Sequence, residues 1–339
     1  MGIPSEPMNE QPSNRAGVNI GHGHVKLCTD RGVEQYAAVA YAPSRQETQS
    51  GLARAKTQRL VVKGKTFEVG AEAALLADRS FDRRVFTKWG GSETYGVLMQ
   101  SVLERLVVMS NGPWRIVFGM PVDHYRDEDY RKALVARWLG SHEDTQGTIH
   151  IAQAMPLYEP LGAFWNWAYS SDVSRITAAS RETIIVDLGY FTTDLNVVNR
   201  GVLNPELGGS LQVAMREVYR GMGKAILKAT SNTYSDLDLE MAVLDEWPLF
   251  VKGIPFDVLS YLLPSMESVA AKIIAWIQGL VDVANSVILV AGGGAQLLLP
   301  HLRLGFPKTE LILAHEPQLA NARGYFHVAK FLSGEVKRA

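Results

Sequence analysis

Residues 184–198 read IIVDLGYFTTDLNVV. Two apolar runs of the kind that form buried strands flank a short turn containing Asp187, Gly189 and the adjacent Thr192 and Thr193. A tight strand–turn–strand with glycine at its tip points successive backbone N–H groups outward, which makes a concavity that binds anions. Glycine lets the backbone approach phosphate oxygens closely, and the threonine hydroxyls can donate hydrogen bonds to them. The stretch therefore predicts a phosphate-binding hairpin.

The carboxylate of Asp187 has a different use, because like charges keep it from binding phosphate directly. It suits a Mg²⁺ ion that bridges phosphates and is held through water, since Mg²⁺ takes oxygen ligands and keeps several waters. The simpler alternative is that the hairpin is only a turn, because Asp-x-Gly is common in turns.

A matching hairpin opens the first half of the chain. VNIGH at 18–22 and VDLGY at 186–190 share one order of residue types: β-branched, Asn or Asp, aliphatic, glycine, ring. Both follow an apolar strand and precede another, so the pattern and its placement repeat together, as expected of a duplicated fold. Gly21 and Gly23 give the first hairpin its backbone freedom, and Lys26 could reach a phosphate as a point charge. Two such hairpins facing each other would grip a polyphosphate from opposite sides.

Strands alternate with helices in both halves, which indicates an α/β architecture. The residues RLVVKGKTFEVG (59–70) have a hairpin signature. The strand SVILV is followed by Gly292, Gly293 and Gly294, a third glycine turn that could lie flat against an adenine and ribose. Helical spacing predicts helices over 95–108, 127–140, about 211–227, 235–245 and about 266–284, and a closing turn and helix over 317–332.

Composition restricts the class of protein. The 339 residues are 47% hydrophobic and 20% charged, as in an ordinary soluble protein, and the length suggests two domains. The net charge of −1 provides no bulk polycation, so direct nucleic-acid binding is not expected. The single cysteine, Cys28, excludes an internal disulfide and suits a reducing cytoplasm. Residues 1–16 are expected to be a disordered tail rather than a signal peptide, and the longest apolar stretch is too short to span a bilayer. We therefore expect a cytoplasmic protein with no membrane partner.

The order of these motifs resembles the actin-like ATPase superfamily. Its first phosphate loop, second phosphate loop, adenosine loop and closing connecting segment are similar to VNIGHGHVK (18–26), IIVDLGYFTTD (184–194), ILVAGGGA (288–295) and PQLANARG (317–324). FEVGAEA, IVFGMPVDHY and YEPLGAFW further resemble the bacterial and archaeal actin-like proteins of the plasmid-segregating ParM type. The resemblance covers nearly the whole chain from about Gly17.

This resemblance implies two ribonuclease-H-like lobes with ATP or ADP and Mg²⁺ in the cleft between them. Lobe I would span residues 17–170, with the C-terminal helix 324–339 packed back on it, and lobe II would span residues 171–323. Glu159 would orient the attacking water, although a solvated turn acid before Pro160 is an equal alternative. Asp187 and Asn19 would hold the metal through water. The phosphates would be bound by Gly21, Gly23, Lys26, Gly189, Thr192 and Thr193, and the nucleoside by Gly292, Gly293 and Gly294, with Gly208 and Gly209 near the ribose.

Asn19 departs from the family pattern, in which Asp is usual. Because an amide removes one negative charge from the metal site, weaker Mg²⁺ binding or slower hydrolysis is expected, without loss of nucleotide binding. Asn19→Asp is then expected to leave hydrolysis unchanged or to make it faster.

The resemblance also implies a filament-forming ATPase that polymerises with itself and moves or segregates plasmid DNA through a DNA-binding adaptor. Two alternatives remain at this point. One is a sugar or acetate-type kinase of the same fold, and the other is a non-polymerising nucleotide-dependent scaffold. Fold alone does not choose among them.

Overall fold

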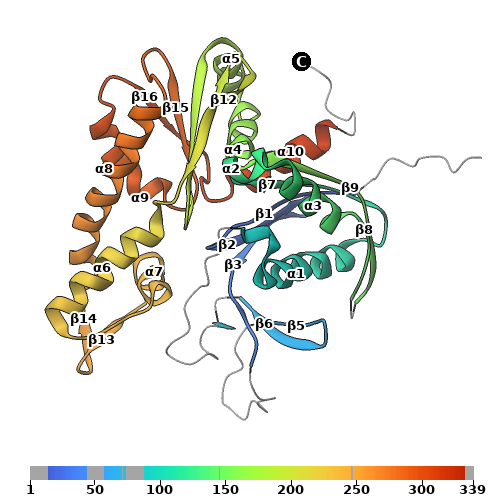
Figure 1. Cartoon of the computed structure of the whole chain (residues 1–339), viewed down its shortest axis with the longest axis horizontal. Coiled ribbons are helices and arrows are strands. Elements are labelled where there is room, and N and C mark those ends of the chain that lie inside the picture. The colour runs from blue at the N-terminus through green and yellow to red at the C-terminus, as the bar shows by residue number, and fades with distance from the viewer. Residues whose placement is uncertain are drawn as a thin grey trace, which may run out of the picture.

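A computed structural model describes residues 14–43, 57–70, 72–73, 88–144, 146–245 and 247–332. The chain forms two lobes, each built around a mixed β-sheet with helices on both faces (Figure 1). The sheet nearer the N-terminus, with the helices that cover it, is called lobe I below, and the other is called lobe II.

The sheet of lobe I has six strands in the order β3-β2-β1-β7-β9-β8. β1 pairs antiparallel with β2 and parallel with β7, which in turn pairs parallel with β9. The strands span Asn14–Ile20 (β1), His24–Thr29 (β2), Gly32–Ala37 (β3), Trp114–Met120 (β7), Gly140–Asp144 (β8) and Gly147–Tyr158 (β9).

The sheet of lobe II repeats this arrangement in five strands, β12-β11-β10-β15-β16. β10 pairs antiparallel with β11 and parallel with β15, as β1 does with β2 and β7. These strands span Glu182–Leu188 (β10), Thr193–Asn199 (β11), Val202–Leu211 (β12), Val287–Ala291 (β15) and Glu310–Leu313 (β16). The predicted two-lobed α/β fold is thus confirmed, and the short sequence repeat marks equivalent hairpins, β1–β2 and β10–β11.

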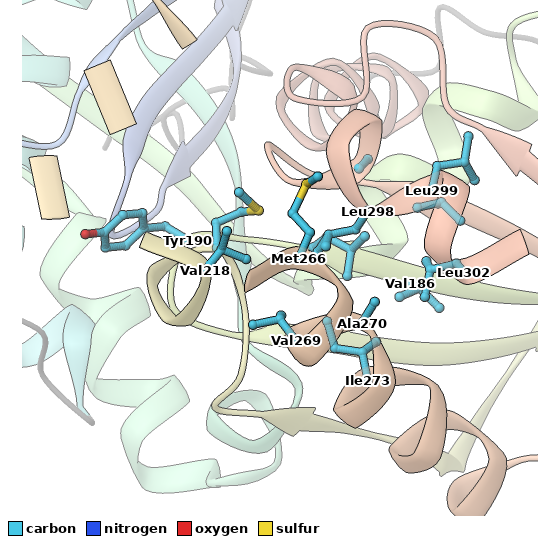
Figure 2. Packing of buried hydrophobic residues seen from close by; sticks show 14 of the residues in the cluster. Val186, Tyr190, Val218, Met266, Val269, Ala270, Ile273, Leu298, Leu299 and Leu302 are labelled. Atoms are coloured by element: carbon cyan, nitrogen blue, oxygen red, sulfur yellow. The ribbon is translucent and has the colours of Figure 1, made fainter. Parts of the chain in front are cut away.

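Apolar helix faces cover the sheets. In lobe I, α1 (Glu93–Met109) and α3 (Glu128–Trp138) cover one face, and α10 (Ala320–Phe331) covers the other. In lobe II, α6 (Met215–Thr230), α8 (Leu262–Leu280) and α9 (Ala295–Gly305) form the larger core with β10 and β15 (Figure 2). The side chains of Val269 and Ile273 on α8 pack there with Leu298 and Leu302 on α9. Val269, Ile273 and Ile277 recur at helical spacing in the sequence, and this pattern predicts the buried face of the helix.

The helix α4 (Glu159–Ala168), expected in lobe I, packs on the sheet of lobe II. Its Leu161, Phe164 and Trp167 form one buried cluster with Ile185 and Leu289, and α5 (Asp172–Ser180) covers the same face. The last helix, α10, lies on β1 and β7 of lobe I and crosses α4 on the way. At this crossing, Gly162 and Gly324 bring the two backbones into contact, because a Cβ on Gly324 would overlap the Gly162 carbonyl. Together, α4 and α10 join the lobes.

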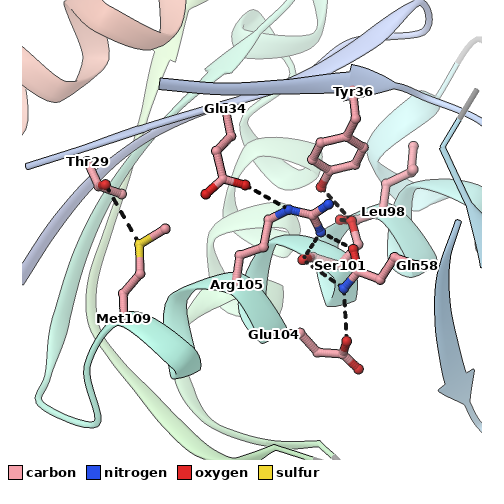
Figure 3. A network of polar contacts seen from close by, with 9 residues as sticks. All are labelled: Thr29, Glu34, Tyr36, Gln58, Leu98, Ser101, Glu104, Arg105 and Met109. Atoms are coloured by element: carbon pink, nitrogen blue, oxygen red, sulfur yellow. Dashed lines mark hydrogen bonds and ion pairs between the residues drawn. The ribbon is translucent and has the colours of Figure 1, made fainter. Parts of the chain in front are cut away.

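Each lobe carries a smaller insertion. In lobe I, β4 (Ala40–Tyr41), β5 (Gln58–Val62) and β6 (Lys65–Val69) form a three-stranded sheet, and the predicted 59–70 hairpin turns at Lys63 and Gly64, with φ of 50° and 76°. Figure 3 shows Arg105 of α1 tying this sheet to lobe I: its guanidinium donates to Glu34 at 3.1 Å and to Gln58, and lies over the Tyr36 ring. In lobe II, α7 (Asp236–Leu244) precedes the hairpin β13 (Leu249–Val251) and β14 (Ile254–Phe256). The remaining short elements are η2 (Trp89–Gly91), α2 (Val122–Arg126) and η3 (Leu259–Tyr261).

Several predicted boundaries shift. Asn14–Ala16, expected in the N-terminal tail, lie in β1, and the rest of that tail falls outside the described residues. The helix predicted from about Leu211 begins at Met215, because 202–211 pairs as a strand with β11. The helix predicted over about 266–284 spans Leu262–Leu280, since Val281 is already extended. Residues 333–339, the end of the predicted C-terminal helix, also lie outside the described part.

Candidate functional site

The two repeated hairpin turns meet at a cleft between the lobes. Its empty volume is roughly 1000 Å³ including the open mouth, at the upper end of the range for small-molecule sites. It brings together ten of the predicted site residues: Asn19, Gly21, Gly23, Lys26, Glu159, Asp187, Gly189, Thr192, Gly292 and Gly293.

The turns have matching geometry. In the first, the Gly21 N–H donates to the carbonyl of His24 at 3.1 Å, and in the second the Gly189 N–H donates to the carbonyl of Thr192 at 3.0 Å. They also touch, since a Cβ on Gly23 would lie 3.0 Å from the Cβ of Tyr190. The sequence repeat is therefore a structural repeat that faces itself across the cleft.

On the lobe I side, Asn19 connects a cation to a carboxylate. Asn19 and Lys26 are direct partners in the β1–β2 ladder. Lys26 Nζ donates to Asn19 Oδ1 at 3.3 Å, and Asn19 Nδ2 donates to Glu159 Oε1 at 2.7 Å. An ionised aspartate at position 19 could not make the second bond, because a carboxylate only accepts. The amide thus has a defined use in this chain, and Glu159 is a partly buried, hydrogen-bonded acid rather than a solvated turn residue.

On the lobe II side, Asp187 is the next-to-last residue of β10 and is 5% exposed. Its Oδ2 accepts a hydrogen bond from Asn321 Nδ2 at 2.7 Å. Gly292, with φ of 93°, lies against the same carboxylate, where any Cβ would overlap Asp187 Oδ1 and the Leu188 carbonyl. Only glycine fits both the conformation and the space at this position.

Asp194 is a cleft residue that the sequence analysis missed. It lies directly opposite Asp187 in the β10–β11 ladder and is 1% exposed. Its Oδ1 accepts from the Val122 N–H at 2.9 Å and from the Ser210 hydroxyl, so it joins lobe II to the start of α2 in lobe I. The signal was present in the stretch TTD, because the hairpin register places its aspartate across from Asp187.

Burial and mutual repulsion dominate the electrostatics. Desolvation, with Asp187 and Asp194 nearby, raises the pKa of Glu159 to about 8. Desolvation, with Asp194 nearby, raises the pKa of Asp187 to about 6, although Lys26 and the Asn321 hydrogen bond oppose that rise. Burial lowers the pKa of Lys26 despite these acids. Among the described residues that line the cleft, Lys26 is the one Lys or Arg.

A divalent cation could be held here through water. Asp187 and Asp194 are buried and Glu159 is partly buried, and these three carboxyls share one ammonium. Buried charges require pairing or a metal. The described residues hold no cluster of three or more His, Cys, Asp or Glu side chains arranged to bind an ion. Mg²⁺ keeps several of its waters, and Asp187 could hold the ion through them.

Four predicted residues lie away from the cleft lining. Thr193 is fully buried and its hydroxyl donates to the Val213 carbonyl at 2.7 Å, which fixes the turn. Gly294 donates its N–H to the Leu188 carbonyl and precedes α9. Gly208 and Gly209 lie in β12 opposite β11, where the strand register shifts, and the Gly208 carbonyl accepts from Arg126 at 3.2 Å. These two glycines shape a strand and its contact with α2 rather than a ribose site.

The cleft lining is mixed in character. Besides the predicted residues it includes Met215, Tyr219, Glu240 and Gln318, which sequence reasoning did not identify. The lobes also touch through a small apolar cluster in which Ala37 and Val39 of lobe I meet Leu237 of α7.

Within the described ranges, no helix combines the length and apolarity needed to cross a membrane.

Comparisons with known proteins agree with this architecture. Residues 17–162 match the family described as actin like proteins N terminal domain, and residues 185–304 match archaeal actin homologue MreB-like, C-terminal. No curated protein matches the chain in sequence.

Solved structures with similar folds cover nearly the whole chain. A non-polymerisable quadruple mutant of pCBH ParM has 21% identity and a TM-score of 0.75, covering 94% of this chain and 99% of its own. The 15-stranded ParM filament from Clostridium botulinum has 19% identity and a TM-score of 0.76, covering 95% and 100%. The archaeal actin homolog Ta0583 in complex with ADP has 18% identity and a TM-score of 0.68, covering 94% and 99%.

Proposed function

Because the chain belongs to the actin-like ATPase superfamily, we propose that it binds Mg-ATP in the interlobe cleft, hydrolyses it and polymerises with the nucleotide bound. The observation that carries the proposal is the pair of matching glycine turns, which face each other beside Lys26, Glu159 and Asp187. Backbone amides around the tips of such turns favour anions.

The phosphates would lie between the turns. The backbone around Gly21 and Gly23 would bind them from lobe I, and Gly189 and Thr192 from lobe II. Lys26 would supply a positive charge. Burial lowers its pKa, and a bound anion would raise that pKa again and so favour the charged ammonium. Asp187 would hold the water shell of Mg²⁺, assisted by Asn19, and the bound ion would neutralise phosphate charge.

Glu159 would orient the attacking water. Its carboxylate accepts from Asn19, so the side chain is positioned at the end of β9 and the start of α4 before any ligand binds. Catalysis of phosphoryl transfer depends mainly on positioning the attacking water and stabilising the charge of the transition state. Glu159 would do the first and Lys26 the second. Gly292 and Gly293, with Glu240 and Gln318, would hold the nucleoside.

Self-assembly is supported by exposed apolar side chains at both ends of lobe II. Phe250 and Ile254 on the β13–β14 hairpin are 51% and 69% exposed, and Val173 and Ile176 on α5 are 75% and 67% exposed. The hairpin and α5 lie at opposite ends of the lobe (Figure 1). A second copy in the same orientation would bring the hairpin of one subunit to α5 of the next. Such head-to-tail contacts do not close on themselves and produce filaments.

ATP would favour the closed, polymerising subunit by bridging the two turns, and hydrolysis would weaken that bridge. By similarity to the ParM filament, we propose that the assembly moves or segregates plasmid DNA through a DNA-binding adaptor in the cytoplasm.

The test is light scattering and pelleting of the full chain together with phosphate release. Mg-ATP is expected to raise scattering, which then decays as phosphate is released. Asp187→Ala is expected to abolish phosphate release while the circular dichroism spectrum stays that of the wild type. A flat scattering trace at high protein concentration, with nucleotide binding intact, would contradict the filament and support the non-polymerising scaffold.

One observation favours a small-molecule kinase as the second candidate. The cleft lining includes three aromatic side chains of lobe I, Trp89, Tyr95 and Tyr130, which could receive an acceptor molecule. Phosphate transfer from ATP that requires an added sugar or carboxylate would establish the kinase. Phosphate release in buffer alone would support the ATPase.

A further inference from the structure

Asn321 occupies the junction between the lobes. It lies in the second position of α10 and is 6% exposed. Its Oδ1 accepts the backbone N–H of Ala163 in α4 at 2.9 Å, and its Nδ2 donates to Asp187 Oδ2 at 2.7 Å. Both halves of the amide are therefore used, and the two bonds join α10, on lobe I, to α4 and to β10 of lobe II.

These contacts fix the orientation of the amide. A flipped amide would set its NH₂ group against the Ala163 N–H and its oxygen against a carboxylate, so both bonds would be lost. The carboxylate of Asp187 is restrained in turn, because Asn321 holds one oxygen and the backbone of Gly292 packs against the other side. Buried side chains held in this way keep one rotamer, which is the condition for a preorganised site.

The same helix also reaches the other acid of the site. Tyr325, one turn beyond Asn321, donates its hydroxyl to the backbone carbonyl of Glu159 at 2.9 Å. α10 thus contacts both Glu159, at the start of α4, and Asp187, at the end of β10. The near approach of Gly162 and Gly324 leaves little room for the two helices to slide without disturbing these bonds.

We propose that Asn321 is a positioning residue for the metal site: it orients Asp187 relative to α4, so that the remaining carboxylate oxygen faces the water shell of the ion. This rests on the proposed function, because it assumes that the cleft takes a nucleotide with Mg²⁺. Asn321 would act through Asp187 and would not touch the nucleotide.

The experiment measures ATP affinity of the full chain with Mg²⁺ and in EDTA, by isothermal titration calorimetry. The ratio of the two affinities is the Mg²⁺ enhancement. Asn321→Leu and Asn321→Ala each remove both hydrogen bonds, the first with a side chain of similar size and the second with a smaller one. Both variants are expected to bind ATP in EDTA within about twofold of the wild type and to lose the Mg²⁺ enhancement by about tenfold or more, the range for a hydrogen bond to a charged group.

Two controls separate positioning from loss of stability. Tyr36→Phe removes a different buried hydrogen bond, the one to Ser101, and is expected to keep the full enhancement. In an Asp187→Ala background, Asn321→Leu is expected to have no further effect on the enhancement, because it acts only through Asp187. Folded Asn321→Leu and Asn321→Ala variants that retain the wild-type enhancement would overturn the inference and leave the proposed function standing. A wild type without any Mg²⁺-dependent ATP binding would overturn both.

Discussion

The partly buried carboxyl of Glu159 should make the nucleotide-free protein less stable as pH rises. Its pKa is raised from 4.5 to about 8 in the folded chain, mainly by desolvation. Between these two pH values the folded state holds a proton that the unfolded state has released. The stabilising contribution of this carboxyl is therefore full below pH 4.5 and is lost as pH rises towards 8.

The size of the effect follows from the same shift. Between pH 6 and pH 8, linkage of this one group lowers the free energy of unfolding by roughly 2 kcal/mol. Asp187, whose pKa is raised to about 6, loses most of its contribution below this window. A glutamine at position 159 cannot ionise but can still accept the hydrogen bond from Asn19. Between pH 6 and pH 8, the free energy of unfolding of Glu159→Gln should therefore fall by about 2 kcal/mol less than that of the wild type.

Urea unfolding of both proteins at pH 6 and pH 8, without nucleotide or metal, measures this difference. In thermal melts it corresponds to about 3 °C for a chain of this length. Ser101→Ala, which loses a buried hydrogen bond to Tyr36 in lobe I, serves as a control that should keep the wild-type dependence on pH. Equal pH dependence in Glu159→Gln and the wild type would refute the assignment of a protonated Glu159 with a raised pKa.

Three further predictions follow from single contacts. Asn19→Asp removes the donor to Glu159 and places two carboxyl groups against each other, so phosphate release should slow. The family pattern alone predicts the reverse. Release at or above the wild-type rate would contradict the role given to the Asn19 amide. Ile254→Lys should abolish Mg-ATP-dependent pelleting, because a charge buried at a subunit contact costs far more than one exposed to solvent. Its ATP affinity should stay within about twofold of the wild type. Unchanged pelleting would show that the hairpin is not part of the interface. Cys28 is buried and its pKa is raised to about 11, so the folded chain should react with a thiol reagent only as fast as it unfolds, and rapid labelling in native buffer would disagree.

The local chemistry of the hairpins was predictable because it depends on neighbours in sequence. Glycine at a strand end, with a polar residue two positions before it, defines a turn that exposes its amides, and the repeat at 18–22 and 186–190 placed a second copy. Asp187 and Lys26 were identified for the same reason, from their own short motifs, whereas Glu159 was identified through the family resemblance.

Contacts between distant segments were beyond this reasoning. Asn321 reaches Asp187 from the last helix, 134 positions along the chain, and only the crossing of α4 and α10 brings it there. The resemblance placed Gly208 and Gly209 near the ribose, but a glycine pair in sequence does not reveal the irregular strand register in which they lie. The placement of α4 on lobe II was also missed, since its apolar face fits a core in either lobe.

The most direct test of the account is a structure of the full chain with Mg²⁺ and a non-hydrolysable ATP analogue. The β- and γ-phosphates should lie between the Gly21 and Gly189 turns, with Lys26 Nζ within hydrogen-bond distance of them and the ion on the side of Asp187. An analogue bound elsewhere on the surface, or phosphates pointing away from either turn, would contradict the central claim.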